Sequence, residues 1–173
     1  GRAVQRRATA LGMRVVGLIS KSTDAELHEA LRTCDYLVIC VPDTDRTRGL
    51  MGKREIGLMQ RTSVLINVSR GSVVDEDALA MALSEHRLRG AGLDVFRKEP
   101  LPSDSPLWAL PNVLITPHVS AVTRRFWDRQ LDLQRATAFV NGADVAAGER
   151  TRVQRIRAGI LFIESYRDLP LLA

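Results

Sequence analysis

Residues 63–86 read SVLINVSRGSVVDEDALAMALSEH, and this stretch decides the fold class. Its first part, SVLINV, is a continuous apolar run of the kind found in parallel strands that are covered on both faces. Its last part, DEDALAMALSEH, has the pattern of a helix. Between them lies a turn with Arg70 and Gly71, so a permanent cation stands where a buried strand ends and a helix is about to begin.

The same alternation of strand and helix continues on both sides of this stretch. Further strands are predicted at RVVGLI (14–19), YLVICV (36–41), GAGLDVF (90–96) and NVLITP (112–117). Further helices are predicted over residues 2–13, 24–34 and 124–142. Strands that alternate with helices form βαβ units, so the sequence predicts an α/β fold with a parallel sheet.

The composition fits one globular domain and excludes several classes of function. The chain has 173 residues, 45% of them hydrophobic and 26% charged, which is enough to bury a core. The net charge is +5, but aromatic residues do not alternate with the arginines, which argues against nucleic-acid binding. Nucleic-acid binding through the basic tail is a weaker hypothesis. No apolar run approaches the roughly 20 residues that span a bilayer. Two cysteines without metal or disulfide spacing fit a reducing compartment, and we expect the cytoplasm.

The ends of the predicted strands carry polar and reactive residues. Ligands of parallel sheets bind outside the carboxyl ends of the strands. The residues delivered there are Ser20, Lys21, Ser22, Val41, Pro42, Ser69, Arg70, Gly71, Asp94, Glu99, Pro100 and His118. An arginine, a carboxylate and a histidine are therefore predicted to converge on one edge of the sheet.

Five segments of the chain, with the helix predicted after them, form a set: GRAVQRRATALGMRVVG, CVPDTDRTRGLM, LINVSRGSVVDEDAL, GAGLDVFRKEPLP and PLWALPNVLITPHVSA. Together they resemble the D-isomer-specific 2-hydroxyacid dehydrogenase family, which includes glyoxylate/hydroxypyruvate reductases, D-lactate dehydrogenases and phosphoglycerate dehydrogenase. Each is weak alone, but their order and spacing make the set specific. The resemblance implies a Rossmann-type fold with helices on both faces of the sheet. It also implies an oxidoreductase that reduces 2-keto acids or oxidises D-2-hydroxy acids with NAD or NADP.

The resemblance also assigns three catalytic residues. Arg70 matches the arginine that anchors the substrate carboxylate, for which a planar guanidinium is suited, and Gly71 lets the backbone approach a ligand closely. His118 matches the acid/base residue that exchanges a proton with the substrate oxygen. Glu99 matches the acid that pairs with this histidine and fixes its orientation. No metal site is implied.

Cofactor contacts follow from the same resemblance. Gly1 aligns with the third glycine of the G-x-G-x-x-G turn. The matches on the nicotinamide side are Val41, Pro42, Val68, Ser69, Arg70, Asp94, His118, Ser120 and Ala121, where Asp94 corresponds to the acid that binds the carboxamide. NAD-preferring members usually carry an acid where Ile19 stands here, and Ser20 with Lys21 could hold a 2′-phosphate. We therefore favour NADP over NAD, while a solvated Lys21 without a role is the simpler reading.

The family pattern also predicts the domain organisation. Residues 1–145 correspond to the NAD(P)-binding domain, and residues 146–173 form a basic tail for which a helix is one reading. The first strand of the family and its first two glycines would precede Gly1. We therefore expect an N-terminally truncated domain whose sheet lacks that strand, which is normally central.

Two functions remain open at this point. The first is a 2-hydroxyacid dehydrogenase acting on a small 2-keto or 2-hydroxy acid, or a fragment of one that is inactive alone, because the family's second domain normally closes over the substrate. Complete members are commonly homodimers. The alternative is a non-catalytic nucleotide-binding or dimerisation module, like the transcriptional corepressors that share this fold. The set of Arg70, Glu99 and His118 favours an enzyme ancestry.

Overall fold

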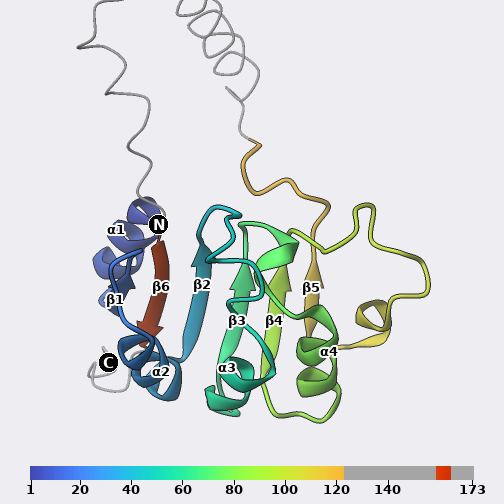
Figure 1. Ribbon diagram of the computed structural model, residues 1–173, viewed down its shortest axis with the longest axis horizontal. Coiled ribbons are helices and arrows are strands. Elements are labelled where there is room, and N and C mark those ends of the chain that lie inside the picture. Colours follow the sequence, from blue (N-terminus) through green and yellow to red (C-terminus); the bar gives the residue numbers. More distant parts are fainter. Residues whose placement is uncertain (123–158, 165–173) are drawn as a thin grey trace, which may run out of the picture. The chain divides into compact units, whose positions relative to one another are not determined.

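The computed structural model describes residues 1–122 and 159–164, and Figure 1 draws the rest of the chain as a grey trace. Residues 1–118 and 159–164 belong to one compact unit, and residues 119–122 belong to a second. The helix predicted over residues 124–142 lies outside the described residues. Among the helices that the structure describes, none is long and apolar enough to cross a membrane.

The described elements alternate between strand and helix, as predicted. The helices are α1 (Arg2–Ala10), α2 (Asp24–Thr33), α3 (Lys53–Leu58) and α4 (Glu76–Ser84), with 3₁₀ turns η1 (Gly71–Val73) and η2 (Pro106–Ala109). The strands are β1 (Arg14–Leu18), β2 (Tyr36–Cys40), β3 (Val64–Asn67), β4 (Gly90–Leu93), β5 (Val113–Ile115) and β6 (Gly159–Glu164). The short helix α3 was not foreseen from the sequence.

One sheet contains all the described strands, in the order β1-β6-β2-β3-β4-β5 (Figure 1). Strands β2, β3, β4 and β5 pair in parallel, which confirms the predicted parallel sheet. Strand β6 is antiparallel to both β1 and β2, so β1 runs in the same direction as β2. Part of the tail for which a helix was considered is therefore a strand, and it lies between β1 and β2 in the sheet.

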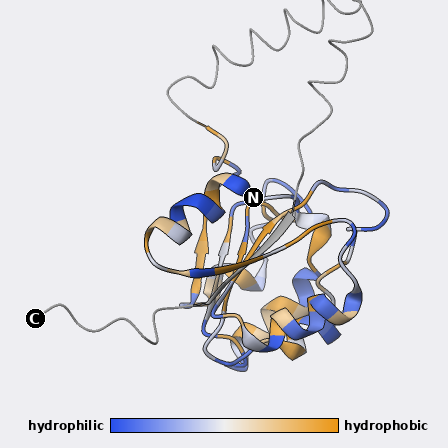
Figure 2. Ribbon diagram, turned by 90° about the vertical axis from the view of Figure 1, so that its left-hand side faces the viewer, coloured by the Kyte–Doolittle hydropathy of each residue, from blue (hydrophilic) through white to orange (hydrophobic). Residues whose placement is uncertain are grey.

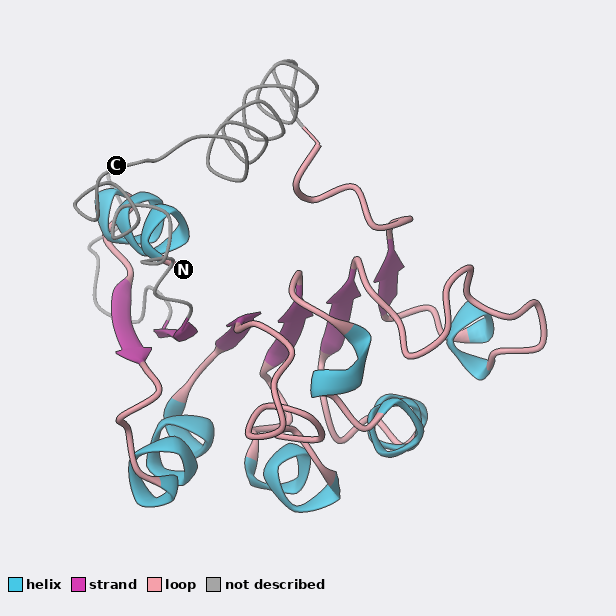
Figure 3. Ribbon diagram, turned by 45° about the horizontal axis from the view of Figure 1, so that its top comes forward, coloured by secondary structure: helices cyan, strands magenta, loops and turns pink. Residues whose placement is uncertain are grey.

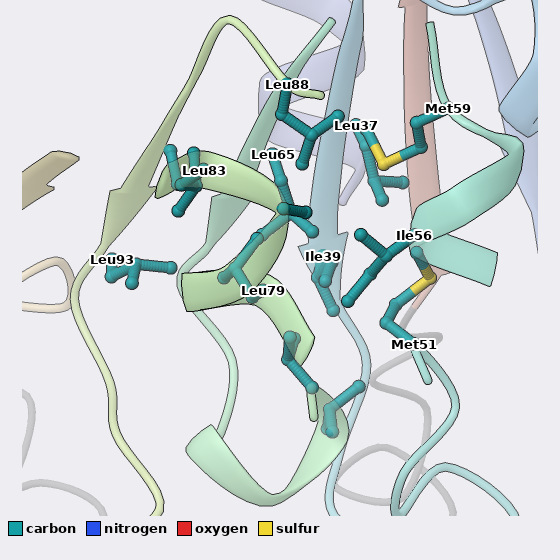
Figure 4. Packing of buried hydrophobic residues seen from close by; sticks show 14 of the residues in the cluster. Leu37, Ile39, Met51, Ile56, Met59, Leu65, Leu79, Leu83, Leu88 and Leu93 are labelled. Atoms are coloured by element: carbon teal, nitrogen blue, oxygen red, sulfur yellow. The ribbon is translucent and has the colours of Figure 1, made fainter. Parts of the chain in front are cut away.

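Helices cover both faces of the sheet (Figure 3). Helices α2, α3 and α4 lie on one face of the sheet and form the main core with the strands (Figure 4). The helices contribute Leu31, Ile56, Leu79 and Leu83 to this core, and the strands contribute Leu37, Ile39, Leu65 and Leu93. Helix α1 lies on the other face, where Ala8 and Val38 are buried together. Hydrophobic colour follows the strands in Figure 2, while α1 is largely hydrophilic. This arrangement leaves the carboxyl ends of the parallel strands along one edge, which is where the predicted site residues fall.

Local capping explains where two of these helices begin. The Thr23 hydroxyl accepts a hydrogen bond from the Glu26 N–H, and the Glu26 carboxylate accepts one from the Thr23 N–H, a reciprocal cap at the start of α2. The Asp75 carboxylate accepts from the Ala78 N–H at the start of α4. Asp75 thus ends the turn that begins at β3 and fixes the start of the helix after Arg70.

Candidate active site

The turn that carries Arg70 is held by a buried asparagine at the end of β3. Asn67 is 1% exposed, and its side-chain oxygen accepts hydrogen bonds from the Ser69 N–H at 3.0 Å and from the Ser69 hydroxyl at 2.8 Å. Its side-chain nitrogen donates to the Arg70 carbonyl at 3.0 Å. Sequence reasoning missed this residue, although a polar side chain at the end of the apolar run SVLINV was a usable signal.

We expect Asn67→Ala to destabilise the protein by about 2 kcal/mol or more, because buried polar groups of Ser69 and Arg70 lose their partner. The measurement is urea unfolding at equilibrium. Asn112→Ala is the matched control, since Asn112 donates one long hydrogen bond, to the Leu83 carbonyl at 3.3 Å, and should lose about 1 kcal/mol or less. Equal losses in the two variants would contradict the role given to Asn67.

Gly71 lets this turn pack directly against another backbone segment. A Cβ atom at Gly71 would lie 1.9 Å from the carbonyl carbon of Phe96 and 2.3 Å from the Arg97 nitrogen. Real Cβ atoms do not approach other atoms so closely. The sequence predicts that Gly71 lets the backbone approach a ligand closely. In the structure, Gly71 lies close to the backbone of the segment that leads to Glu99.

Glu99 and His118 form a direct pair at this edge of the sheet. The His118 Nδ1 atom lies 2.7 Å from the Glu99 Oε2 atom, and the Glu99 Oε1 atom accepts a hydrogen bond from the Phe96 N–H at 3.0 Å. The side chain of His118 is 42% exposed and that of Glu99 is 37% exposed, so solvent and small ligands reach them. His118 has a φ of +55°, in the left-handed region. Glu99 thus fixes the orientation of the histidine ring and connects it to the segment on which Gly71 packs.

The charge state of Glu99 reflects its neighbours. Burial raises its pKa, but the hydrogen bonds from His118 and from the Phe96 N–H, together with the charges of His118 and Arg70, lower it more. The net effect is a pKa below the ordinary value of 4.5. Glu99 is therefore a carboxylate at neutral pH. Arg70, the third predicted residue, directly precedes Gly71, which packs against the backbone of Phe96 and Arg97 on the way to Glu99.

The pH dependence of stability tests this assignment. Folding lowers the pKa of Glu99, so this carboxylate stabilises the native state at pH values above 4.5. The contribution is lost as the pH falls through the pKa of Glu99 in the folded protein. We expect the difference in free energy of unfolding between the wild type and Glu99→Gln to be largest at neutral pH and to shrink below pH 4.5. Denaturant titrations across this range measure it, and a difference that does not vary with pH would contradict the lowered pKa.

Asp94 lies beside this group, directly after β4. It is 3% exposed, and the Thr116 hydroxyl donates to its Oδ1 atom at 2.5 Å. Its N–H donates to the Asn67 carbonyl at 3.0 Å. The structure thus holds the buried Asp94 carboxylate between the ends of β3 and β5. The resemblance predicts that this residue contacts the carboxamide of the nicotinamide.

The remaining predicted residues follow the other strand ends. Those after β2 and β3 are Val41, Pro42, Val68 and Ser69. Ser20 and Lys21 are exposed in the turn after β1, and Gly1 directly precedes α1. Three strand positions separate β1 from β3, or about 14 Å at the usual spacing. The structure thus pairs Glu99 with His118, places Arg70 at the end of β3 on the same edge, and places Ser20 and Lys21 further along that edge.

Two of the predicted cofactor contacts lie outside the compact unit that contains the sheet. Ser120 and Ala121 follow His118 in the chain and belong to the second compact unit. In residues 1–122 and 159–164, no group of three or more histidine, cysteine, aspartate or glutamate side chains could hold a metal ion.

Comparisons with known proteins support the resemblance noted in the sequence. The model of the family described as "D-isomer specific 2-hydroxyacid dehydrogenase, NAD binding domain" matches residues 1–120. Glyoxylate/hydroxypyruvate reductase B of Pectobacterium carotovorum is 49% identical over 98 residues, which cover 57% of this chain and 31% of that protein. Glyoxylate reductase of Korarchaeum cryptofilum is 38% identical over 154 residues, which cover 82% of this chain and 46% of that protein. The chain thus spans less than half the length of these curated relatives.

Solved structures are similar as well. The TT0316 protein of Thermus thermophilus has a TM-score of 0.71 and 39% identity, and the match covers 77% of this chain and 44% of that one. A D-isomer specific 2-hydroxyacid dehydrogenase from Xanthobacter autotrophicus Py2, solved in complex with NADPH and MES, has a TM-score of 0.60 and 38% identity. That match covers 70% of this chain and 50% of the other.

Proposed function

The chain belongs to the D-isomer specific 2-hydroxyacid dehydrogenase family, whose NAD-binding domain matches residues 1–120, and from this premise we propose that it supplies the cofactor-binding and proton-transfer side of an NAD(P)-dependent oxidoreductase. The reaction is hydride transfer between the nicotinamide and a small 2-keto or D-2-hydroxy acid. The names of two relatives, glyoxylate/hydroxypyruvate reductase B and glyoxylate reductase, support this class of substrate. The observation that carries the proposal is the 2.7 Å contact between His118 and Glu99, with the charge of Arg70 acting on the same carboxylate.

Arg70 anchors the substrate in this proposal. A guanidinium is planar and always charged, and its paired N–H groups match the two oxygens of a carboxylate. The Arg70 side chain is exposed and donates one hydrogen bond to the Ser69 carbonyl at 2.7 Å. A guanidinium has five N–H donors, so this bond leaves most of them for a ligand. The same charge polarises the carbonyl next to the bound carboxylate.

His118 moves the proton. Its Nδ1 atom is engaged by Glu99 at 2.7 Å, so the Nε2 atom is the one that gives a proton to the substrate oxygen during reduction and takes it back during oxidation. The carboxylate stabilises the ring when it carries the proton and keeps it from rotating. Glu99 acts through His118 and is therefore a positioning residue.

The residues along the strand ends fit a dinucleotide. The buried Asp94 carboxylate can accept a hydrogen bond from an amide N–H₂, as a carboxamide offers. Ser20 and Lys21 are exposed where phosphate or hydroxyl groups of the far end of the ligand would lie. When bound, the nicotinamide supplies or accepts the hydride.

Lys21 favours NADP in this proposal, in keeping with the NADPH complex of the Xanthobacter relative. We expect Lys21→Ala to weaken NADPH binding about tenfold or more, the effect of one lost charge-assisted hydrogen bond, and to leave NADH binding unchanged. Titration of cofactor fluorescence measures both. Lys53→Ala, at the start of α3, is the control and should change neither. Equal weakening of NADPH and NADH in Lys21→Ala would contradict a 2′-phosphate contact.

The test of the function is cofactor-dependent turnover. Glyoxylate, hydroxypyruvate and other 2-keto acids are offered with NADPH and with NADH, and the absorbance of the reduced nicotinamide is followed. Turnover that survives replacement of both Arg70 and His118 by alanine would refute the site. Cofactor binding without any turnover would instead favour the non-catalytic module of corepressor type. A homodimer and a cytoplasmic location are further parts of the proposal, and light scattering tests the first.

A further inference from the structure

Strand β6 is the sole strand neighbour of β1 in the described sheet. It pairs with β1 from Arg14↔Glu164 to Leu18↔Ile160 and with β2 from Tyr36↔Ile163 to Cys40↔Gly159. The parallel strands β1 and β2 therefore have no direct backbone pairing and are joined through β6, as Figure 1 shows. Backbone pairing on both edges fixes the register of all three strands.

Side-chain packing holds the first part of the chain only weakly. In residues 1–20, Ala8 alone is buried, whereas the buried residues of the main core lie from α2 to η2. Leu18 packs against that core, and Val4, Met13 and Val15 pack around Ala8 and Val38, but all four are only partly buried. Val16 and Ile19 remain 36% and 49% exposed. Burial of apolar surface is the dominant favourable term in folding, so α1 and β1 contribute little of it. The backbone hydrogen bonds of β6 are therefore an important part of their connection to the rest of the sheet.

The segment that fills this position has the chemistry of an interior strand. Residues 159–164 read GILFIE, with two isoleucines and a phenylalanine among six residues. β-branched and aromatic residues favour strands, and continuous apolar runs are typical of strands that are covered on both faces of a sheet. The occupant in the structure is this chain's own segment, within the same compact unit as α1 and β1.

The position of β6 divides the proposed cofactor site into two parts. Gly1, Ser20 and Lys21 belong to the part that contains α1 and β1, while Arg70, Asp94 and the pair of Glu99 and His118 follow strands β3 to β5. We propose that residues 159–164 are a coupling strand that holds the adenosine-binding part of the site in register with the nicotinamide-binding part. The strand pairing does not depend on the proposed function, whereas the effect on cofactor binding rests on it.

Hydrogen exchange of the full-length chain, read by mass spectrometry or NMR, tests the pairing. We expect the amides of residues 14–18 to be protected in the wild type and to exchange like unstructured amides in Phe162→Pro. Proline lacks the N–H and breaks a ladder at the position opposite Val16 and Leu37. Phe162→Val, which keeps a strand-forming residue, is the matched control and should retain the protection. The amides of β3 and β4 should remain protected in all three proteins.

Cofactor affinity tests the coupling. We expect Phe162→Pro to weaken NADPH binding about tenfold or more, because the contacts of Lys21 are no longer held in place, and Phe162→Val to bind as the wild type does. Unchanged affinity in a Phe162→Pro protein whose residues 14–18 have lost protection would overturn the coupling.

Measurements on the wild-type protein alone also test the proposal. Rapid exchange of residues 14–18 in the wild type would overturn the proposal even if Phe162→Pro fails to fold. Protection that disappears on dilution together with a dimer would assign the strand to a second copy of the chain and overturn the intrachain pairing. A wild type that binds no NADPH but protects residues 14–18 would refute the proposed function and the coupling while leaving the strand pairing in place.

Discussion

His118→Asn is expected to lower the turnover number for reduction of a 2-keto acid by about 10²- to 10⁴-fold, the usual contribution of a positioned general acid. Asparagine has no group that titrates near neutral pH, so the proton would have to come from water. It tolerates the left-handed region that residue 118 occupies at a φ of +55°. The expected loss is therefore chemical rather than structural.

His86→Asn is the matched control for this prediction. His86 is exposed, lies just after α4 and has a φ of +53°, so the same substitution is made at nearly the same backbone conformation away from the site. We expect it to keep full activity. Steady-state rates at saturating substrate, measured across a range of pH, compare the two variants. If His118→Asn loses less than tenfold, proton transfer must be assigned to another group.

Gly71→Ala should have the largest effect on stability, a loss of about 4 kcal/mol or more, or failure to fold. Ordinary overpacking costs about 1 to 3 kcal/mol, but here the added Cβ would meet backbone atoms of Phe96 and Arg97 at 1.9 to 2.3 Å. Two backbone segments must separate to admit the methyl group. Because one carries Arg70 and the other leads to Glu99, the same change also pulls the site apart.

Gly57→Ala supplies the comparison. A Cβ at Gly57 meets nothing within 4 Å, and the residue lies in α3, where alanine is favoured over glycine by about 1 kcal/mol. We expect this variant to be as stable as the wild type or slightly more stable. Equilibrium unfolding in urea measures both changes. A Gly71→Ala protein within about 1 kcal/mol of the wild type would mean that the two segments separate easily.

The sequence predicted those parts of the fold whose signal is local. Strand β3 and helix α4 could be read from an apolar run followed by a helical pattern, and Asp75 marked the start of the helix. The common edge of Arg70, Glu99 and His118 followed from the rule that parallel strands end together. The hydrogen-bond distance between Glu99 and His118 could not be predicted, because it depends on loop conformations that no periodic pattern specifies.

The elements that were missed lack such a local signal. Helix α3 has six residues, too few for a periodic pattern, and Gly57 lowers its helix propensity. Strand β6 pairs with residues far away along the chain, so the segment by itself does not indicate which neighbours it will have. Asn67 could be noticed as a polar residue in an apolar run, but its three hydrogen bonds depend on how the following turn closes.

The insertion of β6 also has a consequence for synthesis on the ribosome. The pairing of Val16 with Phe162 joins two distant points of the chain, and contacts of this kind form slowly because a long loop must close first. The nascent chain can assemble β2 to β5 as soon as residue 115 has emerged. Helix α1 and strand β1 must wait, with an open strand edge, until residue 164 has left the exit tunnel. Translational pausing between these two points would lengthen the period in which the growing polypeptide needs a chaperone.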